Sequence, residues 1–255
     1  MNSSPGTSMN LAGKVVIVTG GAQGIGLAIA ERCAENGASV ALWDYQADAI
    51  AGALERIAER SPRAQTAGFI VDVSDLAAVH DAVKATLARF GRIDGLVNNA
   101  GVVADAQLAK MSEAQWDRVI DINLKGVFNC TRASVDALLA SAGAIVNISS
   151  IVGLTGNFGQ TNYAAAKAGV LGMSKTWARE LGAKGVRSNA ICPGVIETPI
   201  LSKMPLRVIE QMVSQIPQKR VGQPREIAAA AVFLLSAEAS YINGATLEVT
   251  GGLTL

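Results

Sequence analysis

The sequence predicts a doubly wound α/β domain, in which a parallel β-sheet carries helices on both faces. Short runs rich in valine and isoleucine alternate with longer alanine- and leucine-rich stretches of helical period. The short runs have no polar face, as expected for strands that are covered on both sides. The chain has 255 residues, of which 50% are hydrophobic and 17% charged, so it is long enough to bury a large core.

The elements alternate regularly along the chain. Apolar runs predict seven strands, over 14–20, 38–44, 67–73, 95–101, 144–150, 187–194 and 245–251. Helical periodicity predicts helices that include 25–37, 75–91, 112–140 and 163–185, with Ser74 as the N-cap of the second. Because no linker or repeat interrupts the series, we expect a disordered tail over 1–10 and one domain over 11–255. The segment near 195–217 has three prolines and weak periodicity, which is typical of a mobile substrate lid.

Composition excludes several classes of function. Twenty-two basic residues against 21 acidic ones leave a formal charge of +1, so no global field attracts nucleic acid or an anionic membrane. No apolar run reaches the roughly 20 residues of a membrane helix. The three cysteines are widely spaced and have no histidine partner, which argues against a disulfide framework and a metal site and fits the reducing cytoplasm.

A glycine-rich loop follows the first expected strand. In "TGGAQGIG", Gly20, Gly24 and Gly26 open a helix whose free N–H groups suit a pyrophosphate, although an ordinary strand-to-helix turn is the alternative. The second strand ends at Asp44, near the offset at which a carboxylate binds the ribose hydroxyls of NAD. Gln23 supplies no cation for the extra phosphate of NADP. NAD is therefore favoured over NADP, unless Asp44 is only a solvated turn residue.

A tyrosine and a lysine four residues apart predict a proton-transfer site. Tyr163 and Lys167 share one helix face in "YAAAK", and the ammonium together with the positive nicotinamide ring is expected to lower the pKa of the phenol toward 7. Tyr163 then serves as general acid or base, although a chance surface pair is the alternative for an isolated motif. Ser150 ends a strand and is expected to bind the substrate oxygen. Asn123 either holds a proton-relay water near Lys167 or makes only structural hydrogen bonds.

These motifs together resemble the short-chain dehydrogenase/reductase family over almost all of residues 11–255. The resemblance rests on "TGGAQGIG", "NNAG" at 98–101, Asn123, Ser150, "YAAAK" and "PGVIETP" at 193–199. It implies a Rossmann-like fold and a catalytic tetrad of Asn123, Ser150, Tyr163 and Lys167. It also implies a cofactor site formed by Gly20, Gln23, Gly24, Ile25, Gly26, Asp44, Asp72, Val73, Asn99, Tyr163, Lys167, Ile196 and Thr198.

Within the family, the sequence is most similar to 3-oxoacyl-(acyl-carrier-protein) reductases. Those reductases usually carry an arginine for NADPH where this chain has Gln23, and they usually lack an acid at the position of Asp44. Of their basic carrier-protein docking positions only Lys184 remains here. We therefore expect an NAD-linked oxidoreductase for a secondary alcohol or ketone. The substrate is either a 3-hydroxyacyl or 3-oxoacyl thioester, or a polyol, steroid or cyclic alcohol.

Two further expectations concern function and assembly. A catalytically silent NAD-binding regulator is the alternative to an enzyme, but such a protein is expected to have lost Ser150, Tyr163 or Lys167. The resemblance, the "AREL" helix and the apolar end "GGLTL" predict a homotetramer without nucleic-acid or membrane partners.

Overall fold

The computed structural model describes residues 9–198, 201 and 206–253. One sheet has seven parallel strands in the order β3-β2-β1-β4-β5-β6-β7. The strands are β1 (Val15–Thr19), β2 (Ser39–Asp44), β3 (Thr66–Ile70), β4 (Gly95–Asn98), β5 (Ala144–Ile148), β6 (Arg187–Pro193) and β7 (Thr246–Val249). Each overlaps one of the seven predicted apolar runs, and the doubly wound fold class is confirmed.

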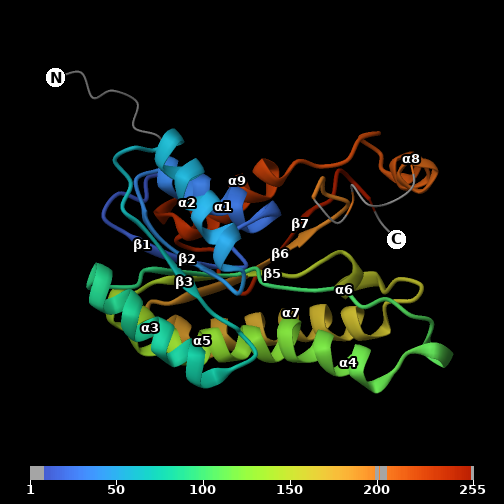
Figure 1. Ribbon diagram of the computed structural model, residues 1–255, viewed down its shortest axis with the longest axis horizontal. Helices are drawn as coiled ribbons and strands as arrows, with labels where there is room; N and C mark the ends of the chain where they lie inside the picture. Colours follow the sequence, from blue (N-terminus) through green and yellow to red (C-terminus); the bar gives the residue numbers. More distant parts are fainter. Residues whose placement is uncertain (1–8, 199–200, 202–205, 254–255) are drawn as a thin grey trace.

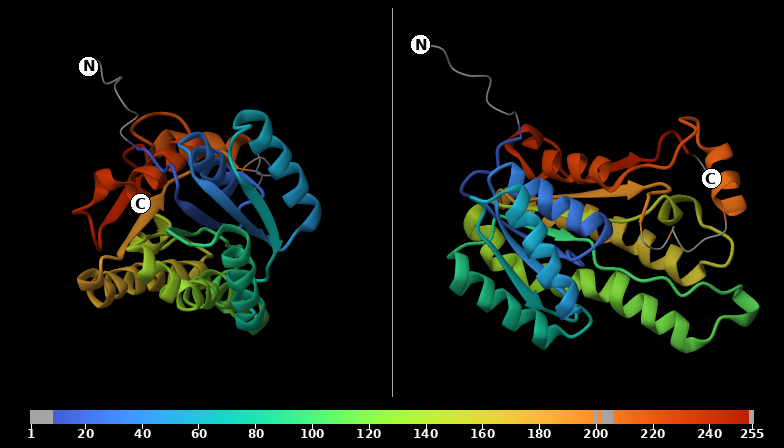
Figure 2. Two further views of the ribbon diagram at one scale, coloured as in Figure 1. Left: turned by 90° about the vertical axis from the view of Figure 1, so that its left-hand side faces the viewer. Right: turned by 45° about the horizontal axis from the view of Figure 1, so that its top comes forward.

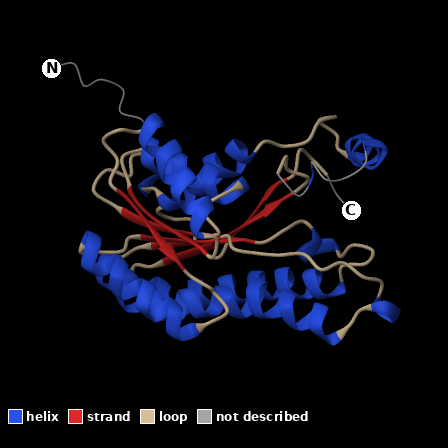
Figure 3. Cartoon of the chain, viewed as in Figure 1, coloured by secondary structure: helices blue, strands red, loops and turns tan. Residues whose placement is uncertain are grey.

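Helices cover both faces of this sheet (Figures 1 and 3). Helices α1, α2 and α9 lie on one face, and α3, α5 and α7 lie on the other, as the two views of Figure 2 also show. The α-helices are α1 (Gly24–Glu35), α2 (Ala47–Arg60), α3 (Leu76–Phe90), α4 (Glu113–Ile120), α5 (Gly126–Ser141), α6 (Val152–Thr155), α7 (Thr161–Leu181), α8 (Leu206–Gln215) and α9 (Pro224–Leu235).

Successive residues of the central strands pack into opposite layers. Val16 and Val18 of β1 belong to the core cluster that includes Ile29 of α1, whereas Ile17 between them belongs to the cluster that includes Val79 of α3. Side chains alternate across a strand, so an uninterrupted apolar run fills both cores at once. The strand segments therefore have no polar face because both of their faces are buried.

The sheet order contains a reversal between two strands. Strand β1 pairs with β2 on one side and with β4 on the other. The chain therefore adds β2 and β3 on one side of β1 and then crosses to add β4 on the other side. In open α/β sheets, ligands bind beyond the carboxyl ends of the strands at such a reversal. The segments after Thr19 of β1 and Asn98 of β4 meet at this point.

Two local predictions are wrong. Asp75, not Ser74, is the N-cap of α3: its carboxylate accepts hydrogen bonds from the N–H groups of Ala77 and Ala78 at 2.8 and 3.3 Å. The Ser74 hydroxyl instead donates to the Asp72 carboxylate at 2.7 Å. The helix expected over 112–140 is two α-helices separated by a π-helical turn, Asp121–Lys125.

The expected N-terminal tail and the expected lid are described only in part. Residues 1–8 of the expected tail lie outside the described residues, but Met9 packs against the core cluster and is not disordered. The expected lid contains α8, whereas 199–200 and 202–205 lie outside the described residues. Among the described helices, none has both the length and the hydropathy needed to cross a bilayer.

Candidate active site

The predicted site residues gather beyond the carboxyl ends of the strands. Gly20 follows β1, Asp44 ends β2, Asn99 follows β4, and Ser150 lies two residues after the end of β5. Parallel strands bring these ends to one edge of the sheet. Residues separated by up to 130 positions in the sequence therefore share one site.

The glycine loop has the geometry of a cradle for a phosphate group. Gly20 and Gly24 adopt the left-handed region, with φ of 59° and 56°. A Cβ atom on Gly20 would lie 2.8 Å from the Ala100 Cα atom, and one on Gly26 would overlap the Gly20 carbonyl oxygen. At the start of α1, Gln23 makes no side-chain cap and the first turn has no acidic residue. The uncapped N–H groups therefore fit an anionic ligand such as a pyrophosphate.

Asn99 and Thr19 hold this loop in place. The Asn99 side-chain amide donates to the carbonyl oxygens of Thr19 and Gly20, both at 3.0 Å. The Thr19 hydroxyl accepts from the N–H groups of Asn99 and Ala100 at 3.0 and 3.1 Å. Sequence reasoning missed Thr19, although a threonine at the end of an apolar strand, just before the glycines, was the available signal.

Asp44 is buried beside the glycine loop, with 5% of its surface exposed. One carboxylate oxygen accepts from the Ala22 N–H at 3.1 Å, and the other from the Gln46 N–H at 3.2 Å. None of the ion pairs among the described residues includes Asp44. Its remaining lone pairs fit the hydroxyl groups of a ribose, and its charge opposes a phosphate there.

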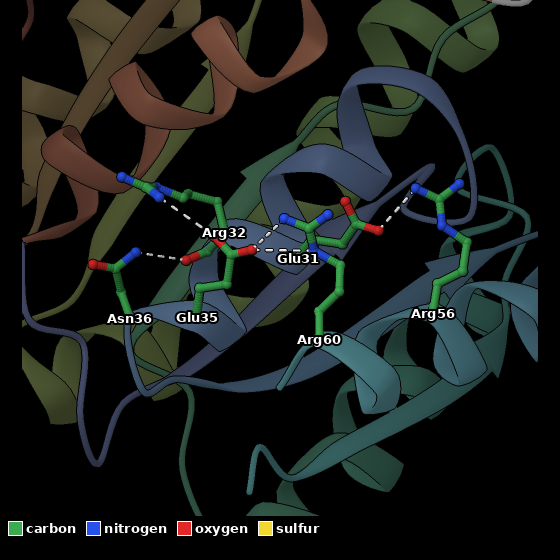
Figure 4. A network of polar contacts seen from close by, with 6 residues as sticks. All are labelled: Glu31, Arg32, Glu35, Asn36, Arg56 and Arg60. Atoms are coloured by element: carbon green, nitrogen blue, oxygen red, sulfur yellow. Dashed lines mark hydrogen bonds and ion pairs between the residues drawn. The ribbon is translucent and has the colours of Figure 1, made fainter. Parts of the chain in front are cut away.

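Ion pairs fasten α2, which follows Asp44, to α1, which carries the glycine loop (Figure 4). The guanidinium of Arg56 lies 2.9 Å from the Glu31 carboxylate, and that of Arg60 lies 2.6 Å from Glu35. Both arginines are more than half exposed, so each pair contributes at most about 1 kcal/mol.

The residues predicted to contact the adenine lie at the end of β3. Val73 is buried, and its Cγ2 atom would lie 2.7 Å from a Cβ atom on Gly126. The Asn129 amide donates to the Val73 carbonyl at 2.9 Å. The Asp72 carboxylate caps the turn by accepting from the Ser74 N–H at 2.9 Å. The segment is thus held by hydrogen bonds, and its contact with adenine stays a prediction.

Tyr163 and Lys167 lie one turn apart on α7, with the ammonium nitrogen 5.6 Å from the centroid of the phenol ring. Lys167 is 3% exposed and donates to the Ile148 carbonyl at 2.8 Å. Burial lowers the pKa of Lys167 to about 8. The Ser149 hydroxyl donates to the Lys167 carbonyl at 2.8 Å, so the end of β5 and the middle of α7 are joined by two hydrogen bonds.

Without a cofactor, the pKa of Tyr163 is raised, and its lowering in the presence of the nicotinamide ring stays a prediction. Burial disfavours the phenolate and raises this pKa, the Ser150 hydroxyl opposes the shift, and the negative charge of Asp105 adds to it. In the protein without a cofactor, the ammonium of Lys167 therefore does not bring the phenol toward 7. The protonated phenol is the form present at neutral pH.

Asn123 lies in the π-helical turn and is fully buried. Its side-chain oxygen accepts from the Val102 N–H at 2.8 Å, and its amide donates to the Val102 carbonyl at 2.9 Å. These are structural hydrogen bonds, which was one of the two expected alternatives. A Cβ atom on Gly101 would lie 3.4 Å from the Asn123 oxygen and 3.6 Å from the Lys167 nitrogen, so both groups lie beside Gly101.

The remaining predicted cofactor residues follow β6. Ile196 is 8% exposed and pairs with Gly222 through an isolated parallel bridge. Thr198 is partly exposed at the end of a described segment. Their predicted place beside the nicotinamide stays a prediction. Within the described residues, no group of three potential metal-ligating side chains is arranged to hold an ion.

Comparison with known proteins gives consistent matches. A family model described as Enoyl-(Acyl carrier protein) reductase matches residues 20–254. The chain is 45% identical over 248 residues to the 3-oxoacyl-[acyl-carrier-protein] reductase FabG of Thermotoga maritima, covering 97% of this chain and 100% of that protein. It is 42% identical over 251 residues to the (3R)-3-hydroxyacyl-CoA dehydrogenase of Homo sapiens, covering 95% and 96%. A crystal structure of levodione reductase matches with a TM-score of 0.91 and 38% identity, covering 94% and 97%.

Relatives of this similarity, matched along nearly the whole chain, define the class of protein as an oxidoreductase that uses a nicotinamide cofactor. The glycine loop, the buried side chains of Ser150 and Lys167 and the partly buried Tyr163 agree with this class. The chain belongs to the short-chain dehydrogenase/reductase family.

Proposed function

We propose that this protein is an NAD(H)-dependent oxidoreductase that interconverts 3-hydroxyacyl and 3-oxoacyl thioesters. The names of the reductase from Thermotoga maritima and the dehydrogenase from Homo sapiens support the acyl substrate. The observation that carries the cofactor preference is the buried carboxylate of Asp44 beside the glycine loop. An extra ribose phosphate would meet this negative charge without a cation at Gln23 to offset it.

The side chains of the site support a division of roles. A nicotinamide cofactor held by the glycine loop and Asp44 would supply or accept the hydride. Tyr163 gives its phenolic proton to the substrate oxygen during ketone reduction and takes a proton back during alcohol oxidation. The Ser150 hydroxyl donates a hydrogen bond to the same oxygen as charge develops on it. Lys167 holds a positive charge one turn from Tyr163 and favours its phenolate.

The raised pKa of Tyr163 affects which direction of the reaction, reduction or oxidation, the free protein favours. A phenol that stays protonated at neutral pH is ready to act as an acid, so the free protein is prepared for ketone reduction. Oxidation needs the phenolate, which higher pH and the positive charge of an oxidised nicotinamide ring both favour. We therefore expect the oxidation rate to rise with pH.

A matched substrate screen tests the proposal. We expect acetoacetyl-CoA to be reduced with NADH at a higher kcat/KM than with NADPH, and at a higher kcat/KM than cyclic ketones. The likeness to levodione reductase supports levodione as the second candidate substrate. Preference for levodione over acetoacetyl-CoA would replace the acyl assignment, and preference for NADPH would overturn the cofactor assignment.

We also propose that the protein is a cytoplasmic homotetramer. The residues that we expect to form its contact surfaces differ from those that the sequence indicated. Ala178 and Leu181 of the "AREL" segment and Leu253 near the C-terminus are buried within the protomer and offer little contact surface. Phe128 of α5 is instead 46% exposed, and Trp116 of α4 is 38% exposed. Association through these helices would cover both. Light scattering tests the assembly, and a monomer at micromolar concentration would contradict it.

A further inference from the structure

Three sets of hydrogen bonds join the segment after β4 to the beginning of α7. The Ala106 N–H donates to the Gly159 carbonyl at 2.8 Å. The Asn162 amide donates to the Ala104 carbonyl at 3.0 Å. The Gln160 side-chain amide donates to both oxygens of the Asp105 carboxylate, at 3.1 and 3.0 Å. Tyr163 comes directly after these residues, so the Asp105 carboxylate is fastened next to the predicted catalytic turn.

The orientation of the Gln160 amide is itself fixed. The Asn157 amide donates to the Gln160 side-chain oxygen at 2.9 Å, so the amino group of Gln160 faces Asp105. The Asn157 side-chain oxygen in turn accepts from the Phe158 N–H at 3.0 Å. An exposed carboxylate that is held by two hydrogen bonds from an oriented amide has a defined position rather than a range of rotamers.

The negative charge of Asp105 acts on the phenol of Tyr163. The hydrogen bonds from Gln160 hold the carboxylate beside the start of α7, three residues before Tyr163, and its negative charge adds to the effect of burial in raising the pKa of the Tyr163 phenol. Among the described residues, the ion pairs do not include Asp105. A substrate whose oxygen receives the proton of Tyr163 is therefore exposed to the field of a carboxylate that no ion pair among the described residues neutralises.

We propose that Asp105 is a specificity-determining residue that disfavours substrates with a free carboxylate close to the reacting carbonyl and so selects neutral 3-oxoacyl esters and thioesters. This inference rests on the proposed function and deepens it. A 3-oxo acid carries its negative charge two carbons from the ketone, whereas the corresponding thioester is neutral there. Repulsion by Asp105 thus separates two compounds that have the same reacting group.

The substitution Asp105→Asn tests this role because asparagine keeps an oxygen that accepts from Gln160 but loses the charge. Ethyl acetoacetate is the neutral substrate and acetoacetate the anionic one, both reduced with NADH at pH 7 and low ionic strength. In D105N, we expect the ratio of kcat/KM for acetoacetate to that for ethyl acetoacetate to rise about tenfold, which corresponds to about 1.4 kcal/mol. Added salt is expected to raise the same ratio in the wild type and to have less effect in D105N.

Asp81→Asn is the matched control. Asp81 is an exposed carboxylate on α3, which lies at the opposite end of the molecule from α6 and the start of α7 (Figure 1). The ratio is expected to stay at the wild-type value in D81N. An unchanged ratio in D105N, or an equal rise in D81N, would overturn the role of Asp105.

Failure of the proposed function can be distinguished from failure of the proposed role of Asp105. If the wild type reduces neither acetoacetyl-CoA nor ethyl acetoacetate, the acyl assignment is wrong. Acetoacetate and ethyl acetoacetate are then compared as competitive inhibitors against levodione or whichever ketone of the substrate screen is reduced. Tighter inhibition by acetoacetate in D105N than in the wild type, relative to ethyl acetoacetate, would still support the charge selection. Equal relative inhibition would overturn it.

Discussion

The ammonium nitrogen of Lys167 lies 5.6 Å from the centroid of the Tyr163 ring and donates a hydrogen bond to the carbonyl oxygen of Ile148 at 2.8 Å. One buried cation is thus placed beside the phenol and attached to the end of β5. Burial lowers the pKa of Lys167 to about 8, which shows that the fold holds this charge at a cost in stability.

Lys167→Met is expected to stabilise the protein at neutral pH. Below pH 8 the lysine is protonated in both the folded and the unfolded chain, so the burial penalty is fully present. Between pH 8 and the ordinary value of 10.5, the unfolded chain binds more protons and wild-type stability rises with pH. Allowing about 1 kcal/mol for the lost Ile148 hydrogen bond, we expect a gain of about 1–2 kcal/mol at pH 7.

Urea unfolding at pH 7 and pH 10 measures this effect. The difference between Lys167→Met and the wild type is expected to shrink as pH rises, while dehydrogenase activity is lost at both values. Equal destabilisation of the variant at both pH values would show that the ammonium stabilises the fold.

Asp44→Ala is expected to narrow the preference for NAD over NADP. The substitution removes the charge that opposes the extra phosphate and the oxygens predicted to bind the ribose, so the ratio of the two kcat/KM values should fall about tenfold to a hundredfold. Steady-state kinetics with both cofactors measure the ratio. Asp48→Asn, which removes an exposed carboxylate in the first turn of α2, is the control. A ratio that falls equally in both variants would contradict a direct role for Asp44.

Gly26→Ala is expected to abolish cofactor binding with the fold otherwise intact. The new methyl group would overlap the Gly20 carbonyl oxygen, so the glycine loop must move away from α1. Fluorescence titration with NADH measures the binding. On α2, a Cβ atom at Gly52 meets nothing within 4 Å, so Gly52→Ala is the matched control and should bind NADH normally. Normal binding by Gly26→Ala would mean that the loop does not hold the pyrophosphate.

Glu226→Gln is expected to reduce stability above pH 4.5 but to have less effect in acid. The Arg220 guanidinium donates to both oxygens of Glu226, and this hydrogen bonding is the main cause of a pKa of about 2. A carboxylate with a lowered pKa stabilises the fold above its ordinary pKa, and the contribution is lost as pH falls toward 2. Because the ion pair is largely exposed, we expect the loss of stability to be small.

Thermal unfolding of Glu226→Gln and the wild type, from pH 7 to pH 3, measures this contribution. The difference in Tm should close as pH falls below 4.5. A difference that is constant over the whole range would mean that the carboxylate charge contributes nothing.

The sequence predicts the strands better than the local details of the site. Apolar runs such as 14–20 and 144–150 identify buried parallel strands because both of their faces lie in a core. The π-helical turn around Asn123 was not predictable, because the residues on either side of it keep helical periodicity. The raised pKa of Tyr163 in the protein without a cofactor was also not predictable from the sequence. It depends on burial and on Asp105, which is 58 positions away in the sequence and is brought near by Gln160.

The central claim is that the hydroxyl of Tyr163 transfers the proton, and Tyr163→Phe tests it most directly. The variant keeps the aromatic ring, the glycine loop and Asp44, so the Kd for NADH should stay within a few-fold of the wild type. The kcat for the best substrate should fall by about 10² to 10⁴, the range typical for loss of a general acid or base. Normal NADH binding with this loss of turnover is the predicted result. Retention of most activity by Tyr163→Phe would contradict the account, because the proton would then come from another group.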